Sequence, residues 1–225
     1  MKLLSTIRAW LGKFKPRALA ASTFLVAAAF TVVACSGGTP QASAPGGIAP
    51  DKVVDYIAAT ALGGRTAYVK HVVNRVTLLE GEPVERENAV VDAHSTEFWE
   101  DEDGIPLPAQ MFRLASEVTS ADDLAGGFTI GLISSWNIND AHSPKTDFEK
   151  DAIKEMEETA SPVKIEQEIA GQRYMTAMYP DKAVAEACVT CHNTHPIHLE
   201  RYPDKVFALD DVMGGVVINL PLGDA

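Results

Sequence analysis

Residues 163–192 read VKIEQEIAGQRYMTAMYPDKAVAEACVTCH. Two runs rich in branched and aromatic residues, Val163–Ile169 and Arg173–Tyr179, stand on either side of Ala170-Gly171. This pattern predicts a hairpin of two antiparallel strands. Pro180 then predicts the start of a short helix, because proline is well placed in the first helical turn. That helix would carry CVTCH, the end of the quoted stretch.

The pentapeptide Cys188-Val189-Thr190-Cys191-His192 has the CxxCH spacing of c-type haem attachment. Cysteines three positions apart lie on one helical turn, where each thiol can add to one vinyl group of a haem. The imidazole of His192 would then be an axial ligand of the iron. The sequence therefore predicts one covalent haem c, held by Cys188, Cys191 and His192.

Other uses of these cysteines agree less well with the sequence. Two thiols with the imidazoles of His195 and His198 would suit zinc, but only three residues separate the two pairs. A thiol oxidoreductase would need a thioredoxin-like βαβ pattern, which is missing. No acid–base pair, phosphate loop or GxSxG motif indicates an enzyme, so we expect none. The alternative is a haem-dependent enzyme that acts on peroxide or nitrogen oxides.

Three side chains are candidates for the sixth ligand of the iron. Pro106 and Pro108 predict a rigid turn just before Met111, which would present the thioether at a fixed point. His71, on a predicted helix, and His94 are the alternatives. Exposed arginines would pair with the haem propionates, and the candidates are Arg113, Arg173 and Arg201.

The N-terminus has the pattern of an export signal. A basic stretch is followed by an uncharged apolar run over 18–34, slightly short for a membrane span of about 20 residues. The run ends in Val32-Val33-Ala34-Cys35, which resembles a bacterial lipobox. We therefore expect a lipoprotein signal peptide over 1–34 and lipidation of Cys35, with an uncleaved signal anchor as the alternative. The resemblance to such lipoprotein signals implies, from Ser36 rather than Asp after the cysteine, the outer membrane, facing the periplasm.

The formal net charge is −12, and the basic leader makes the rest of the chain more acidic still. Such a surface repels nucleic acid, which we exclude as a partner. Small residues, glycine and proline dominate 35–50, which predicts a flexible tether. Residues 51–225 then form one domain.

The remaining patterns predict an α+β fold, because strands and helices follow one another without βαβ alternation. Helices would flank a small antiparallel sheet. We predict a long N-terminal helix over 51–80, an irregular loop over 82–104, helices over 109–118 and 147–159, and further strands over 128–134 and 212–222.

Several segments stand in an order that resembles one family. They are Pro106-Leu107-Pro108-Ala109, SSWNINDAHSPKTDFE (134–149), Arg173-Tyr174-Met175, CVTCHNTHP (188–196) and Asp211-Val212-Met213-Gly214-Gly215. The chain from Val53 to Leu222 thus resembles the bacterial periplasmic c-type haem domains with a PAS-like fold. The resemblance implies haem packed on an antiparallel sheet of about five strands, and a Met, Cys or water as sixth ligand.

Within that family, the implied role is electron transfer or redox and small-gas sensing. The partner would be a redox protein or a small gaseous ligand. This sequence departs from the family in lacking a free cysteine for the distal side of the haem, because its third cysteine is assigned to lipid. We also expect no transmitter domain in this chain.

Overall fold

The computed structural model of the protein describes residues 47–223. The predicted signal peptide (1–34), Cys35 and the tether as far as residue 46 lie outside this range. Within it, no helix combines the length and the apolar character needed to cross a membrane. The elements are α1 (Pro50–His71), η1 (Val73–Arg75), β1 (Val76–Leu79), β2 (Glu82–Pro83), β3 (Val91–Thr96), β4 (Ile105–Pro106), α2 (Pro108–Ala121), η2 (Asp123–Ala125), β5 (Thr129–Ile133), η3 (Asp140–His142), α3 (Asp147–Thr159), β6 (Val163–Ile169), β7 (Gln172–Lys182), α4 (Glu186–Thr194), α5 (Pro196–Arg201) and β8 (Val212–Pro221).

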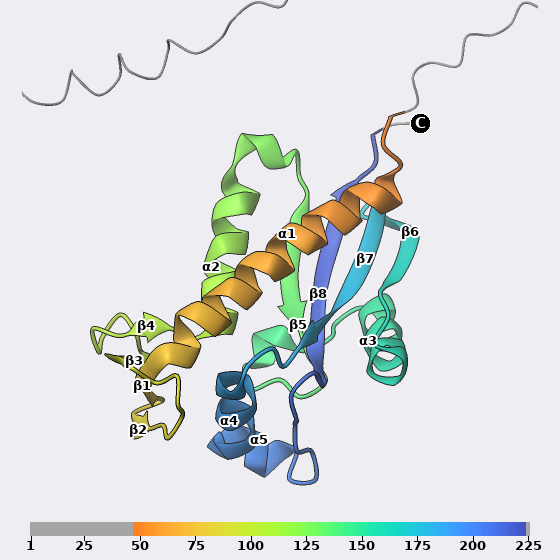
Figure 1. Cartoon of the computed structure of the whole chain (residues 1–225). Coiled ribbons are helices and arrows are strands. Elements are labelled where there is room, and N and C mark those ends of the chain that lie inside the picture. Colours follow the sequence, from red (N-terminus) through yellow and green to blue (C-terminus); the bar gives the residue numbers. More distant parts are fainter. Residues whose placement is uncertain (1–46, 224–225) are drawn as a thin grey trace, which may run out of the picture. The chain divides into compact units, whose positions relative to one another are not determined.

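The fold is α+β with two four-stranded sheets, rather than one sheet of about five strands. The main sheet has the order β5-β8-β7-β6, and all of its neighbouring strands are antiparallel. The small sheet has the order β2-β1-β3-β4 and includes two parallel pairs. Helix α1 begins beside the main sheet and ends at the small one, while α4 and α5 lie together at one end of the main sheet (Figure 1).

Three predicted boundaries are wrong. The first helix ends at His71, because the β-branched residues that follow lead into β1, which pairs with β3. The predicted irregular loop over 82–104 contains β2 and β3. Pro180 does not start a helix but lies in β7, opposite Gly215 of β8. Proline is tolerated there because the pairing of β6 with β7 stops at Met178, which leaves that side of Pro180 without a neighbouring strand.

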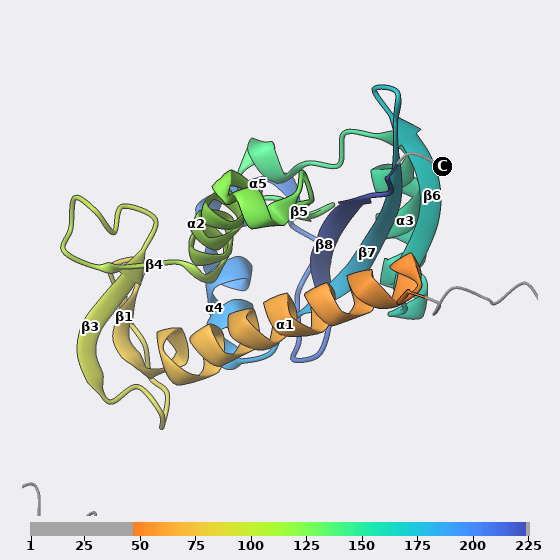
Figure 2. The ribbon, with the colours of Figure 1, turned by 90° about the horizontal axis from the view of Figure 1, so that it is seen from above.

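Both faces of the main sheet are buried. On one face, Val54 and Phe112 of α1 and α2 pack on Tyr179, Val216 and Ile218. On the other face, α3 packs its own apolar stripe on Met178 and Val217. Alternate residues of β8 therefore pack in two different hydrophobic cores, one on each face of the sheet. This explains why the sequence of β8 is apolar almost without interruption. Figure 2 shows α1 running along the length of the domain.

The start of β8 tolerates no side chain at Gly214. A Cβ atom there would lie 2.4 Å from the carbonyl oxygen of Ile133 on β5, a backbone atom that cannot rotate away. We expect Gly214→Ala to lower the free energy of unfolding by about 2 kcal/mol, as overpacking typically does. Urea unfolding would measure this loss. The matched control is Gly131→Ala on β5, where a Cβ atom meets nothing within 4 Å, and equal stability of the two variants would contradict the prediction.

A carboxylate fastens α1 to the main sheet. Asp55 accepts hydrogen bonds from the ammonium group of Lys164 and, at 2.8 Å, from the hydroxyl of Tyr179. These bonds, led by that of Lys164, lower the pKa of Asp55 to about 2.

We expect Asp55→Asn to cost about 1 kcal/mol of stability at pH 7, because the pair is partly solvated. Since the folded-state pKa of Asp55 is depressed, its contribution is complete above the unfolded pKa of about 4 and disappears as the pH falls towards about 2. The free energies of unfolding of wild type and Asp55→Asn should converge as the pH is lowered from 7 to 2. A difference between the two free energies of unfolding that stays constant over this pH range would contradict this interpretation.

Candidate haem-binding site

Helix α4 carries the CVTCH motif and places all three of its chemically active side chains on one cavity. Glu186 in the first turn favours this helix electrostatically, and His195 ends it. Cys188, Cys191 and His192 all line the cavity, which has a volume of about 160 Å³. The two cysteines are free thiols, so no disulfide competes for them.

Burial sets the protonation of these groups. It raises the pKa of Cys191 to about 12 and also raises the pKa of Cys188, so both thiols keep their protons at neutral pH. Burial, together with electrostatic interactions with His198 and Arg65, lowers the pKa of His192 to about 4. A neutral imidazole has the free lone pair that a metal ligand needs.

The ring of His192 is oriented by aromatic packing. It meets Phe207 edge-on with ring centroids 5.6 Å apart, and Phe207 in turn meets Trp136 edge-on at 5.4 Å. The Nδ1 atom of His192 is buried and has no hydrogen-bond partner among residues 47–223. An imidazole that is neutral, oriented by packing and placed beside two thiols agrees with the donor set of a haem c site.

The other two histidines near the motif have structural roles. His195 accepts a hydrogen bond at its Nδ1 atom from the amide of Ile197 and so caps α5. His198 is fully buried, and its Nε2 atom lies 2.8 Å from the carbonyl oxygen of Lys205. In the described part of the chain, no three His, Cys, Asp or Glu side chains are grouped closely enough to hold a metal ion. The four-donor zinc arrangement is therefore not assembled.

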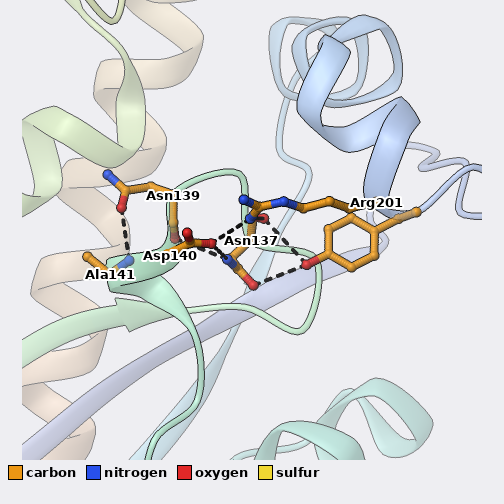
Figure 3. A network of polar contacts seen from close by, with 6 residues as sticks. Asn137, Asn139, Asp140, Ala141 and Arg201 are labelled. Carbon is orange, nitrogen blue, oxygen red and sulfur yellow. Dashed lines mark hydrogen bonds and ion pairs between the residues drawn. The ribbon is translucent and has the colours of Figure 1, made fainter.

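A polar network holds the segment between β5 and α3 against α5. Figure 3 shows the guanidinium of Arg201 on Asp140, at 2.6 Å, and beside Asn137. The hydroxyl of Tyr202 donates to the side-chain oxygen of Asn137 at 3.1 Å. The amide of Ser134 donates to the carbonyl oxygen of His142 at 2.9 Å. These contacts fix the short helix η3 at the cavity.

That segment brings His142 to the cavity, a residue that the sequence did not single out. His142 and Met213 are the His and Met side chains on the cavity wall outside 188–195. Met213 packs in the same cluster as Cys188, beside the motif. Burial, together with Arg113 and Lys145, lowers the pKa of His142 and favours the neutral imidazole.

The structure does not bring the three predicted sixth-ligand candidates to this cavity. Met111 lines a second cavity, between α1 and α2. His71 is exposed at the last residue of α1. His94 lies on β3, with its Nε2 atom 3.8 Å from Glu102. None of the three is among the residues that line the cavity of the cysteines.

The predicted propionate partners are likewise not among the residues that line this cavity. Arg113 pairs with Glu117 on α2, and Arg173 pairs with Glu166 between neighbouring strands. Arg201 holds the η3 segment as described above. The arginine that does line the cavity is Arg65 of α1, which pairs with Asp181 at 2.6 Å. Nothing in its sequence surroundings points to this role, because α1 reaches the cavity only through tertiary packing.

Comparison with known proteins identifies the family of the chain. No curated protein sequence matches the chain. Among solved structures, the cyanobacterial haem protein Tll0287 matches at 14% identity and a TM-score of 0.44, over 79% of this chain and 99% of that one. The family model described as Tll0287-like matches residues 51–221, nearly the whole described range. The chain therefore belongs to the Tll0287-like family.

Proposed function

We propose that this chain is a mono-haem c-type protein, with thioether bonds at Cys188 and Cys191 and His192 as an axial ligand. The observation that carries the proposal is that these three side chains line one cavity from a single helix. Membership of a family named after a protein solved as a haem protein supports the same reading. Bound haem supplies an iron that can change oxidation state or bind a small gas.

Each residue of the site would have one role in holding the haem. Cys188 and Cys191 would each hold the haem through a thioether bond to one vinyl group, with the thiol proton going to the other vinyl carbon. His192 keeps a ring-nitrogen lone pair available for the metal because burial suppresses its protonation. His142 stands on the cavity wall as the imidazole available for the sixth position. The main sheet with its flanking helices would be the PAS-like part of the fold.

The cellular setting belongs to the same proposal. The leader and Cys35 support a lipid-anchored protein on the periplasmic side of a bacterial membrane, the outer membrane by virtue of Ser36. Its role there would be electron transfer with a redox partner protein, or redox and small-gas sensing. The acidic composition supports the exclusion of nucleic acid as a partner.

Two measurements test this proposal. The mass of the mature protein under denaturing conditions should exceed that of the polypeptide by one haem. The reduced absorption spectrum, recorded with and without carbon monoxide, then separates the roles: an unchanged spectrum indicates a six-coordinate electron carrier, and a shifted one indicates a gas-binding sensor. A fully matured sample without colour would refute the haem assignment itself.

A further inference from the structure

The second cavity lies between α1 and α2, and residues at the start of β5 also line it. Figure 1 shows the two helices close together near the small sheet and farther apart towards their other ends. The walls are mostly apolar, with Ile57 and Ala61 from α1, Met111 and Phe112 from α2, and Ile130 from β5. The volume of about 610 Å³ falls within the range of small-molecule sites.

The hydroxyl groups on these walls are already used within the protein or exposed to water. The hydroxyls of Thr60, Tyr68 and Ser116 donate to backbone carbonyl oxygens at 2.9, 2.7 and 2.8 Å. The hydroxyl of Thr119 does the same at 2.8 Å. Tyr56 is 60% exposed, so water can satisfy its hydroxyl. A ligand in this cavity would therefore meet apolar surface and few free hydrogen-bonding groups.

The charged end of Arg65 does not change this, although Arg65 lines the cavity. Its Nη2 atom donates to Asp181 at 2.6 Å, and the two side chains line the cavity of the cysteines. The Nε and Nη1 atoms of Arg65 are buried. Arg65 therefore contributes its methylene groups to the second cavity, as long charged side chains commonly do.

The second cavity is long rather than round. Its lining residues on α1 run from Tyr56 to Tyr68, a stretch of about 18 Å at the rise of an α-helix. Those on α2 run from Pro108 to Thr119, which is nearly as long a stretch. An extended hydrocarbon chain of about 14 carbons covers this length. A compact ring system would leave much of the apolar wall uncovered.

We infer that the second cavity binds the hydrocarbon chain of a lipid and leaves the polar head group outside, in solvent. Each methylene group that leaves water for the apolar walls favours binding. A head group inside would lose its hydration without gaining hydrogen bonds, because the hydroxyls of the walls already have partners. The inference does not depend on the proposed haem function.

A series of fatty acids tests this inference by calorimetry. Octanoate, decanoate, dodecanoate, tetradecanoate and hexadecanoate are titrated below their micellar concentrations into lipid-depleted, haem-loaded Cys35→Ser protein, which carries no lipid of its own. Detergent is omitted because its alkyl chain would compete. We expect the affinity to rise about fourfold with each methylene group, up to a length of about 14 carbons, and then to level off. An affinity that is independent of length, or that rises as steeply from tetradecanoate to hexadecanoate, would refute a chain bound along this cavity.

Three variants locate the binding. Gly64 lines the cavity, whereas its neighbour Gly63 is not among the lining residues, and a Cβ atom at either glycine meets nothing within 4 Å. Gly64→Phe should abolish binding of tetradecanoate, and Gly63→Phe should leave it unchanged. Ala115→Phe, from the α2 side of the cavity, should also abolish it. Full binding in both Gly64→Phe and Ala115→Phe would place the fatty acid elsewhere and overturn the inference.

A free membrane lipid and the lipid predicted at Cys35 have the same hydrocarbon chemistry. An organic extract of Cys35→Ser protein, made before lipid depletion, distinguishes these two sources. Lipid in the extract indicates a free lipid as the occupant, whereas a lipid-free extract from protein that binds tetradecanoate indicates the predicted anchor. Either result supports a hydrocarbon-chain site.

One further result would overturn the inference. If no fatty acid binds and Gly64→Phe converts a dimer to a monomer in sedimentation, the cavity is an interface between two copies of the chain. Haem content is read separately from the mass, so a failure here leaves the haem proposal standing, and the reverse also holds.

Discussion

A protein in which Cys188 and Cys191 are both replaced by alanine will keep no haem after denaturation. The two thiols line the same cavity as His192, and they are the attachment points that the structure offers there. Without them, any haem is held by coordination and packing alone, and both are lost on unfolding. Denaturing mass spectrometry of the mature protein should therefore give the polypeptide mass for the double variant and the polypeptide plus one haem for wild type.

Two controls make this result specific. Thr190→Ser changes a residue between the cysteines without touching a thiol, and it should retain the whole of the covalent haem. His192→Ala should also retain covalent haem while its absorption spectrum changes, because it removes the ligand but not the attachment. Covalent haem in the double variant, or a full loss in Thr190→Ser, would contradict the assignment of the two thioethers.

The main sheet could be predicted because its signals are local. The strands β5, β6, β7 and β8 were expected near their observed positions, and helix α3 was expected over 147–159, where it lies. Runs of branched residues and one helical apolar stripe are sufficient for such elements. The small sheet could not be predicted, because β2 and β4 span two residues each and its parallel pairs join segments that are apart in the chain.

The residues of the site also differ in whether the sequence alone could reveal them. Cys188, Cys191 and His192 are adjacent in sequence, so one turn of helix brings them together and a motif reveals them. His142 and Arg65 reach the same cavity from other elements, and only the tertiary structure shows it. The one available signal for His142 was the SSWNINDAHSPKTDFE segment, which was recognised for family resemblance and not for its histidine. Met111 was favoured for its rigid local turn, but its helix directs it to the other cavity.

Replacing His142 with alanine will give the largest spectroscopic change of any substitution outside α4. His142 lines the cavity of the cysteines, and its lowered pKa favours the neutral form that can bind iron. Its position is fixed by the contact of its carbonyl oxygen with Ser134 and by the network around Asp140 and Arg201. With His142 as the sixth ligand, its removal should convert a six-coordinate reduced spectrum to a five-coordinate one.

Carbon monoxide then provides the quantitative readout, because it no longer has to displace an imidazole. Its affinity should rise at least about tenfold in His142→Ala, which corresponds to about 1.4 kcal/mol. Met111→Leu is the matched control, since it conserves volume in the other cavity and should change neither the spectrum nor the affinity for carbon monoxide. If Met111→Leu gives the five-coordinate spectrum and His142→Ala does not, then the sulfur of Met111 binds the iron. In that case His142, on the part of the cavity wall formed by η3, has no part in coordination.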